Sequence, residues 1–453
     1  MSKQMNSAEI VDYLKQRSLE FVKVGLFDVD GVMRGKYMCV DKFIESLDKG
    51  FAFCDVVLGW DSSDKLYDNV DITGWEKGYG DAQVRILPET MRLIPFENDL
   101  PLFLVEFTGK HEAVCPRGTL KRVLALAEKL GYEVSTAAEF EFFVFDETPH
   151  SVREKNYKNL SSITPGNFGY SVLRSTTESD FYHKLLSMTK AMDMEIESLH
   201  TETGPGVLEA AIRVDSALES ADKAALFKTF TKVLAQQNNR MATFMAKWSP
   251  DWPGQSGHIH ISMRQKNGDS VFFDAEKPNN MSDEMRWFIG GQQALMPELL
   301  AMVACTVNSY TRLIPGFWAP TDASWGIENR TCALRAILGS EFSQRVEYRI
   351  SAADINPYIA MAAAIGSGLW GIQNKIEPDA PVEGNSYDKE FSPELKLPRT
   401  LMEAAQRLRA SSVARELFGD AFVDHYASTR EWEEREARGA ITDWQLERYF
   451  EVI

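Results

Sequence analysis

The sequence predicts an α+β protein in which a curved antiparallel sheet forms a charged funnel and helices pack around it. Two observations lead to this fold class. Four stretches alternate polar and apolar residues with the period of 2 that strands have, and longer stretches with helical spacing separate them. The chain also has 453 residues, which is too long for one compact core and predicts two or three domains.

Composition narrows the class of protein. The net charge of −17 argues against a nucleic-acid partner. The five cysteines are odd in number and far apart, which favours reduced thiols over a disulfide framework or a zinc site. No signal peptide and no run of 18 apolar residues is recognisable, so we expect a cytoplasmic protein without a membrane span.

The N-terminal part is expected to form a small α+β domain over residues 1–112, followed by a larger domain over 113–453. Ser7 is a plausible N-cap of a first helix. Residues 21–27 and 32–40 form two strands around the turn Asp30-Gly31. The stretch 51–96 contains short apolar runs, and its Trp60 and Asp61–Asp64 predict an exposed loop. The second domain begins near Pro116, which can open a helix.

The central strand, 136–145, carries two glutamates in an otherwise apolar run. Glu139 and Glu141 point the same way, because side chains two residues apart share a face of a strand. Like charges held close and out of water are costly, so a positive group must lie between them if this face is buried. A divalent metal ion is the simplest such group. An edge strand with a solvated polar face is the alternative.

Three further stretches repeat this pattern. Residues 195–202 place Glu195 and Glu197 on one face, and Glu202 and Glu209 flank the turn 203–206. Residues 257–263 alternate His258, His260 and Ser262 with apolar residues, and 345–350 alternate Arg345, Glu347 and Arg349. A solvated sheet face would favour Lys, Thr and Ser, so the clustered Glu, His and Arg favour a funnel. Between the strands we expect helices at 180–192, 220–244, 282–305 and 356–376, and a long loop or lid at 146–177.

Arginines form the last cluster. Arg312, Arg330 and Arg335 lie among turn residues, and Arg345 and Arg349 follow them. Arginine binds carboxylates and phosphates through two parallel hydrogen bonds. Oxyanionic ligands together with divalent cations indicate phosphoryl transfer. Neither a P-loop nor a dinucleotide-binding glycine motif is present, so both of those folds are excluded.

Over nearly its whole length the sequence resembles the glutamine synthetase superfamily. The matching motifs are residues 28–36, Cys115-Pro116-Arg117, 138–142, 257–262, Asn308 to Gly316, Asn329-Arg330-Thr331, 345–349 and Asn356-Pro357-Tyr358. Residues 242–247 and 323–326 resemble the branch that makes γ-glutamyl amides from larger amines, γ-glutamylpolyamine synthetases in particular. The resemblance implies an N-terminal β-grasp domain, a C-terminal catalytic barrel, and homo-oligomers of two stacked hexameric rings, a dodecamer with active sites between subunits.

The resemblance also implies site residues. One Mg²⁺ or Mn²⁺ ion would be held by Glu141, Glu202 and Glu209, and the other by Glu139, His258 and Glu347. ATP would contact Glu197, His260, Ser262, Arg335 and Arg345. L-glutamate would be held by Gly257, Arg312 and Arg349, and the transferring phosphate by Arg330.

Departures from the family pattern concern the amine and the nucleotide. Ammonia-using members carry a glutamate where this chain has Trp318, which can instead form a wall for an organic amine. Asp55 is the nearest candidate for the catalytic aspartate of the N-terminal domain, although the alignment needs a gap there. Phe342 replaces a basic nucleotide-binding residue. The tyrosine used for adenylylation control is absent from residues 391–400.

The leading hypothesis is an ATP-dependent ligase that joins L-glutamate to an alkylamine or polyamine through γ-glutamyl phosphate, with a place in nitrogen metabolism and polyamine catabolism. A polyamine would need acidic residues at the pocket mouth, for which Asp61, Asp64 and Glu328 are candidates. A true glutamine synthetase using ammonia is the first alternative. A catalytically silent structural relative is the second, and the intact set of metal-ligand candidates argues against it.

Overall fold

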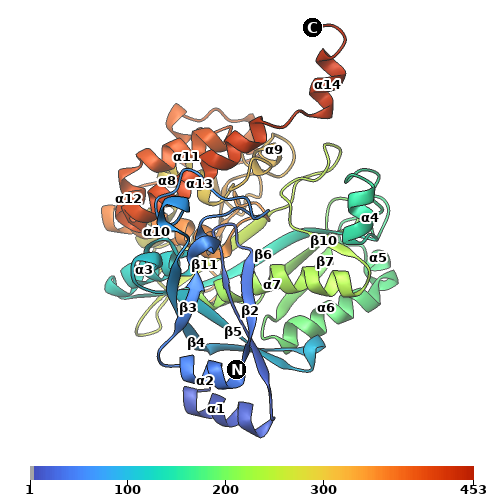
Figure 1. Ribbon diagram of the computed structural model, residues 1–453. Helices are drawn as coiled ribbons and strands as arrows, with labels where there is room; N and C mark the ends of the chain where they lie inside the picture. The colour runs from blue at the N-terminus through green and yellow to red at the C-terminus, as the bar shows by residue number, and fades with distance from the viewer. Residues whose placement is uncertain (1–4) are drawn as a thin grey trace.

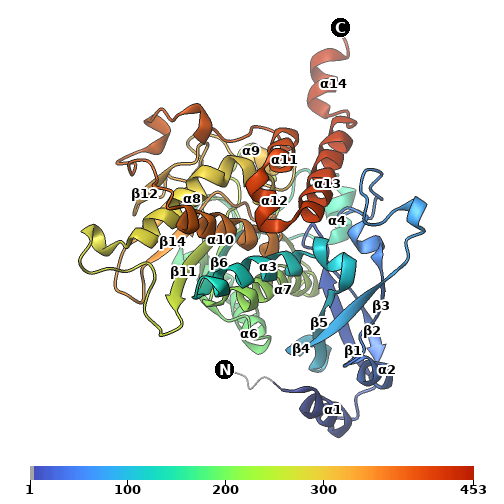
Figure 2. The same ribbon diagram turned by 90° about the vertical axis from the view of Figure 1, so that its left-hand side faces the viewer.

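Two β-sheets organise the chain, and helices cover them (Figure 1). The computed structural model describes residues 5–453. The predicted α+β class is confirmed: one sheet of five strands lies in the N-terminal part, and a curved sheet of nine strands follows. Figure 2 shows the first sheet standing beside the larger, helix-covered body.

The first sheet has the strand order β2-β1-β5-β4-β3. Its strands are β1 (Phe21–Phe27), β2 (Met33–Cys39), β3 (Phe51–Cys54), β4 (Asp81–Ile94) and β5 (Leu100–Phe107). β1 and β5 are parallel and the other pairs are antiparallel. The predicted hairpin forms because the Asp28 carboxylate accepts hydrogen bonds from the backbone N–H groups of Asp30 and Val32.

The second sheet has the order β12-β13-β14-β11-β6-β8-β7, with β9 and β10 also paired to β6. Its strands are β6 (Tyr132–Phe145), β7 (Ile196–Thr201), β8 (Val207–Ile212), β9 (Asp215–Ser216), β10 (Met241–Thr243), β11 (Gly257–Gln265), β12 (Trp325–Ile327), β13 (Leu334–Ile337) and β14 (Arg345–Tyr348). The four predicted strands are therefore β6, β7, β11 and β14. All pairs are antiparallel except β12 with β13.

The helices occupy most of the remaining chain. They are α1 (Ser7–Gln16), α2 (Val40–Ser46), α3 (Pro116–Lys129), α4 (Pro149–Glu154), α5 (Val172–Thr177), α6 (Ser179–Ala191), α7 (Ala217–Gln237), α8 (Asp283–Leu299), α9 (Ser309–Arg312), α10 (Pro357–Asn374), α11 (Leu401–Ala410), α12 (Ser412–Phe418), α13 (Asp420–Arg438) and α14 (Asp443–Tyr449). Figures 1 and 2 both show α14 reaching away from the body at the C-terminus.

Several predicted boundaries were wrong for identifiable reasons. Asn6 caps α1, because its side chain accepts from the N–H groups of Ala8 and Glu9. α7 ends at Gln237, after which Asn239 turns with φ of 54° and the chain pairs with β6 as β10. The stretch 146–177 contains two short helices; a capping box at Thr148 and a proline in the first turn begin α4.

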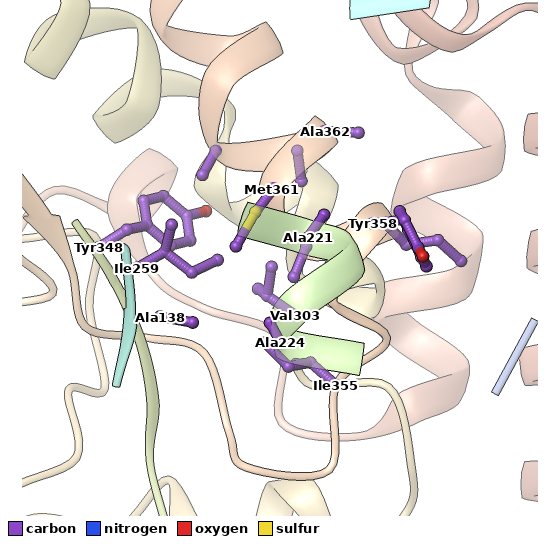
Figure 3. Packing of buried hydrophobic residues seen from close by; sticks show 14 of the residues in the cluster. Ala138, Ala221, Ala224, Ile259, Val303, Tyr348, Ile355, Tyr358, Met361 and Ala362 are labelled. Carbon is purple, nitrogen blue, oxygen red and sulfur yellow. The ribbon is translucent and has the colours of Figure 1, made fainter. Parts of the chain in front are cut away.

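The core lies against one face of the large sheet. Ala138 of β6, Ile259 of β11 and Tyr348 of β14 are all buried on the face away from the predicted polar set. Figure 3 shows them facing Ala221 and Ala224 of α7 and Met361 of α10. The small residues of α7 and α10 let these helices approach the sheet closely, which fixes the opposite face as a rigid platform.

The N-terminal hairpin is fastened to the helical body. Arg430 of α13 is 1% exposed and donates to the Asp30 carboxylate at 2.5 Å and to the Cys305 carbonyl at 2.6 Å. The Asn356 side chain, which caps α10, donates to the carbonyl of Asp28 at 2.9 Å.

Within residues 5–453, no helix combines the length and apolar composition needed to cross a bilayer.

We expect Arg430→Met to lower the free energy of unfolding by about 3–5 kcal/mol, because it leaves a largely buried carboxylate without its partner. Chemical denaturation followed by fluorescence measures this. Arg435→Met is the matched control: Arg435 also links α13 to the N-terminal part, through Asp68 at 2.6 Å, but both side chains are about half exposed or more. It should cost less than about 1 kcal/mol. Equal effects of the two substitutions would contradict the role given to Arg430.

Candidate functional site

A cavity of about 830 Å³ opens over the polar face of the large sheet. β6, β8, β11 and β14 supply its floor, and loops carrying Tyr170, Trp318 and Phe342 supply its rim. Most of the predicted site residues line it: Glu139, Glu141, Glu197, Glu202, Glu209, His258, His260, Ser262, Trp318, Arg330, Arg335, Arg345, Glu347 and Arg349. Strand alternation brings them together, because the apolar residues between them face the core.

The first group of donors gathers where β6, β11 and β14 run side by side. His258 pairs with Glu139 across the strands. Nδ1 of His258 lies 3.5 Å from a Glu139 oxygen and 3.5 Å from a Glu347 oxygen, and Nε2 of His260 lies 3.3 Å from Glu139. Ligand atoms of Glu139, His260 and Glu347 all lie within 4.8 Å of one another. His260, expected to contact ATP, thus also stands among the metal-ligand candidates.

Burial and nearby cations have opposite effects on the pKa of the carboxylates in this group. Burial alone would raise the pKa of Glu139, but hydrogen bonds from His258 and His260 outweigh it and hold that pKa below its ordinary range. Burial is likewise outweighed at Glu347, where the positive charges of Arg349 and His258 lower the pKa to about 2. Both carboxylates are therefore ionised.

The second group lies beside Glu141. The Glu141 carboxylate accepts from the Ser256 N–H at 2.7 Å, and Glu202 accepts from the Thr203 hydroxyl at 2.8 Å. Glu209 pairs with Glu141 across β6 and β8. Burial and the negative charges of Glu139 and Glu141 raise the pKa of Glu209, although a nearby histidine opposes them. Carboxylates that repel one another in this way fit a divalent cation that neutralises them.

The arginines form a cationic border on the β14 side. Arg335 donates to Glu347 at 3.1 Å and also pairs with Glu328. Arg349 pairs with Glu347 at 2.5 Å, and Nε of Arg345 lies 3.2 Å from Nδ1 of His260. Because these guanidinium groups face the carboxylate cluster, phosphate oxygens entering the cavity would meet cations on one side.

Two predicted glutamate-binding residues lie beneath the cavity surface. Arg312 is 1% exposed and donates to the Ile350 carbonyl at 2.9 Å and to the Ser256 hydroxyl at 2.9 Å. A Cβ on Gly257 would stand 2.6 Å from the Ala352 carbonyl oxygen and 3.0 Å from the Phe140 ring. Gly257 therefore allows β11 to approach its neighbours closely, and Arg312 shapes the floor.

Asp55 lies outside this cavity. It begins a short helical turn after β3 and is 4% exposed. Its carboxylate accepts from the Thr73 hydroxyl at 2.6 Å and lies 3.4 Å from Nε2 of His111. In this chain the Asp55 side chain is thus surrounded by its own domain.

The structure adds residues that the sequence patterns did not single out. The His200 ring lies 3.3 Å from Glu209 and stacks on Tyr170 with ring centroids 4.2 Å apart. The hairpin register, which places His200 opposite Glu209, could have indicated the histidine. Tyr170 follows no periodic pattern, and only the folded loop brings it to the cavity.

Aromatic side chains form part of the rim of the cavity. Trp318 is 57% exposed, adopts φ of 57°, and lines the cavity together with Phe317 and Tyr170. The Phe317 ring packs under the ammonium of Lys247 at 4.7 Å. The same cavity is thus lined by flat apolar faces and by carboxylates, a combination that suits a cation with an organic body.

Comparisons with known proteins agree on one family. The catalytic domain of glutamine synthetase matches residues 113–449. "Type-1 glutamine synthetase 2" of Dictyostelium discoideum is 45% identical over 100% of this chain and 88% of its own length. "Glutamate--isopropylamine ligase" of a Pseudomonas species is 35% identical over 98% of both chains. Ligand-free GmaS superposes with a TM-score of 0.86 at 23% identity, covering 98% of this chain and 100% of its own.

We expect Mn²⁺ to raise the thermal unfolding midpoint relative to EDTA, because a cation relieves repulsion among the buried carboxylates. At a hundredfold excess over Kd the gain is about 2.7 kcal/mol. Glu139→Gln and Glu347→Gln should each weaken Mn²⁺ binding, measured by titration calorimetry, by at least the roughly 10- to 100-fold typical of losing even an outer-shell partner. Glu195→Gln is the control, because Glu195 pairs with Arg213 and does not line the cavity. Unaltered binding by the first two variants would remove them from the metal site.

Proposed function

The chain belongs to the glutamine synthetase family, and from this premise we propose that it is an ATP-dependent ligase joining the γ-carboxylate of L-glutamate to an organic amine. In the first step a γ-carboxylate oxygen attacks the terminal phosphorus of ATP, giving γ-glutamyl phosphate and ADP. In the second step the amine nitrogen attacks the acyl carbon, and inorganic phosphate and a proton leave.

The residues that line the cavity support this proposal. A carboxylate acylates poorly and a mixed anhydride acylates well, so the phosphorylated intermediate must be formed and kept from water. Arg335, Arg345 and Arg330 would bind phosphate oxygens, and Arg349 would bind a glutamate carboxylate. Glu197, Ser262 and His260 would complete the contacts to ATP, with Gly257 and Arg312 shaping the glutamate site.

Two divalent cations would complete the site. Glu139, His258 and Glu347, with His260 beside them, offer a set of oxygen and nitrogen donors, and Glu141, Glu202 and Glu209 offer three carboxylates. Nε2 of His258 is buried without a hydrogen-bond partner in the described chain, which suits a nitrogen awaiting a ligand. When bound, Mg²⁺ or Mn²⁺ would neutralise the phosphate oxygens during transfer.

The aromatic rim is the observation that carries the choice of acceptor. Trp318 occupies the position at which ammonia-using relatives would place a carboxylate, and residues 315–320 contain no acidic residue. Trp318, Phe317 and Tyr170 line the same cavity as Glu202 and Glu209 and add apolar surface to it. An alkyl group gains from these faces by leaving water, whereas ammonia has no apolar surface to bury.

Among organic amines we favour compact monoamines over polyamines. A second ammonium group needs a carboxylate at the mouth, and the candidates are already engaged. Asp64 accepts from Arg34 at 2.6 Å, Glu328 pairs with Arg335, and the Asp61 carboxylate accepts from the N–H groups of Ser63 and Lys65. None of these three lines the cavity of the described chain. Polyamine catabolism is therefore the weaker of the two assignments.

Ammonia remains the second candidate acceptor, because the relative that is 45% identical is named a glutamine synthetase.

We further propose that the chain assembles into a dodecamer of two stacked rings. In that assembly, Asp55 would contribute to catalysis only if its domain meets a neighbouring subunit's cavity. A silent structural relative is disfavoured by the complete donor sets at Glu139 and Glu141.

A panel of amines in a phosphate-release assay with L-glutamate and Mg-ATP tests the function. We expect isopropylamine, methylamine and ethanolamine to stimulate release far more than ammonium, and more than putrescine or spermidine. Omission of glutamate should abolish the stimulation. Equal or better stimulation by ammonium would reject the organic-amine assignment, and a preference for putrescine would reject the monoamine choice.

Trp318→Glu should shift preference toward ammonium, because it replaces an apolar face by a carboxylate that can hold a small cation. We expect a change of about tenfold in the ratio of kcat/KM for isopropylamine to that for ammonium, or about 1.4 kcal/mol of transition-state discrimination. Tyr157→Glu, at an exposed aromatic residue that does not line the cavity, is the control. An unchanged ratio would show that Trp318 forms no part of the amine pocket.

A further inference from the structure

One carboxylate next to the phosphate-binding arginines has no part in the chemistry described so far. Glu328 follows directly after β12, and its side chain is 45% exposed. It pairs with Arg335, whose side chain is 12% exposed. In the described chain Arg335 lines the cavity and Glu328 does not. The carboxylate therefore contacts this arginine outside the lining of the cavity.

Hydrogen bonds fix both partners of this pair. Nε and Nη2 of Arg335 both donate to Oε2 of Glu328, at 3.1 Å and 2.5 Å. Oε1 of Glu328 accepts from the backbone N–H of Leu338 at 3.1 Å, so the carboxylate itself is held in place. Nη1 of Arg335 donates to Glu347 at 3.1 Å. The guanidinium is thus held in one orientation, with N–H groups left over for a further acceptor.

The sheet register explains why the acceptor comes from Glu328. Arg335 of β13 pairs with Glu347 of β14, and Glu347 pairs in turn with His260 of β11. On its other side Arg335 pairs with Gly326 of β12, which has no side chain to offer. The acceptor on this side is supplied by Glu328, two residues beyond Gly326. Arg335 therefore lies between two carboxylates, of which Glu347 belongs to the candidate metal ligands and Glu328 does not.

The backbone of Glu328 adopts a conformation that residues with a side chain rarely use. Its φ is 51°, in the left-handed region. Such conformations persist only where surrounding contacts hold them, and they are concentrated at functional sites. The backbone N–H of Glu328 donates to the Ala336 carbonyl at 3.0 Å. The next side chain, Asn329, donates to the carbonyls of Val382 and Gly384 at 3.0 Å and 2.8 Å. Contacts on both sides of the turn therefore keep Glu328 against β13.

We propose that Glu328 is a positioning residue for phosphate binding, which holds the Arg335 guanidinium in the orientation that meets phosphate oxygens in the cavity. The inference rests on the proposed function, which supplies the phosphates. A free arginine side chain samples many rotamers, and fixing it before the ligand arrives lowers the entropic cost of binding. An anion paired with Arg335 could instead compete with phosphate. Because Glu328 lies outside the cavity lining, a phosphate in the cavity does not need to displace it.

The test measures binding of ADP and of pyrophosphate, each with Mg²⁺, to the full chain by titration calorimetry. Glu328→Gln keeps the shape of the side chain and removes its charge. We expect it to weaken both ligands by about tenfold, a coupling usual between contacting residues, because both ligands contain the phosphates that Arg335 would bind. Glu328→Asp keeps the charge on a shorter side chain and should lose less. Glu377→Gln is the matched control and should change neither affinity. Glu377 also accepts from Nε and Nη2 of an arginine, Arg286, and neither of the two lines the cavity of the described chain.

A double-mutant cycle determines whether Glu328 acts through Arg335. When Arg335 is already replaced by Arg335→Met, Glu328→Gln should cause no further loss of ADP affinity. An equal loss in both backgrounds would overturn the proposal, as would unchanged affinity of the Glu328→Gln variant for both ligands. Tighter binding by Glu328→Gln would also overturn it, because Glu328 would then compete with phosphate for the arginine. Failure of the unaltered chain to bind ADP with Mg²⁺ would instead reject the ligase assignment.

Discussion

Glu139 and Glu141 stand two residues apart on the inner face of β6, within a strand whose other face is packed against helices. Their mutual repulsion can be borne only where cations or hydrogen-bond donors surround them. Nearby residues supply such groups: His258 and His260 of β11 lie against Glu139, and the backbone N–H of Ser256 donates to Glu141. Glu347 of β14 adds a further carboxylate, and Arg335 of β13 and Arg349 pair with it. The curved sheet therefore concentrates carboxylates on its inner face, where a cation can bind.

Packing on the opposite face of the same strands explains why this part of the sheet is rigid. Ala138, Phe140 and Phe142 are buried, and Phe140 and Phe142 contact Phe227 of α7. A shift of β6 by one residue would exchange the two faces and place the glutamates in the core. The packing of the core thus fixes the register of β6, and the register fixes the positions of Glu139 and Glu141. Both carboxylates are therefore held in place before a ligand binds.

The strands and site residues that the sequence predicts are those that follow a regular alternation of polar and apolar residues. The strands around Glu139, His258 and Glu347 were predictable because each alternates strictly, and their shared face follows from that alternation. β8 was missed because its residues are nearly all buried, and β12 and β13 because they are three and four residues long. Tyr170 and the burial of Asp55 depend on contacts with His200, Thr73 and His111, which no local pattern encodes. Resemblance to a family supplied the ligand assignments; the residues alone left metal binding and a solvated face open.

The bond between Asp30 and Arg430 joins residues 400 positions apart. During synthesis at roughly 5–20 residues per second, the first hairpin leaves the ribosome about 20–80 s before the helix that secures it. The turn at Asp28–Val32 has its internal hydrogen bonds from the start, but it acquires its docking partner only when nearly the whole chain exists. The contact between Asp30 and Arg430 can therefore form only late in folding. In a chain that terminates before α13, the Asp30 carboxylate would have no Arg430 to pair with.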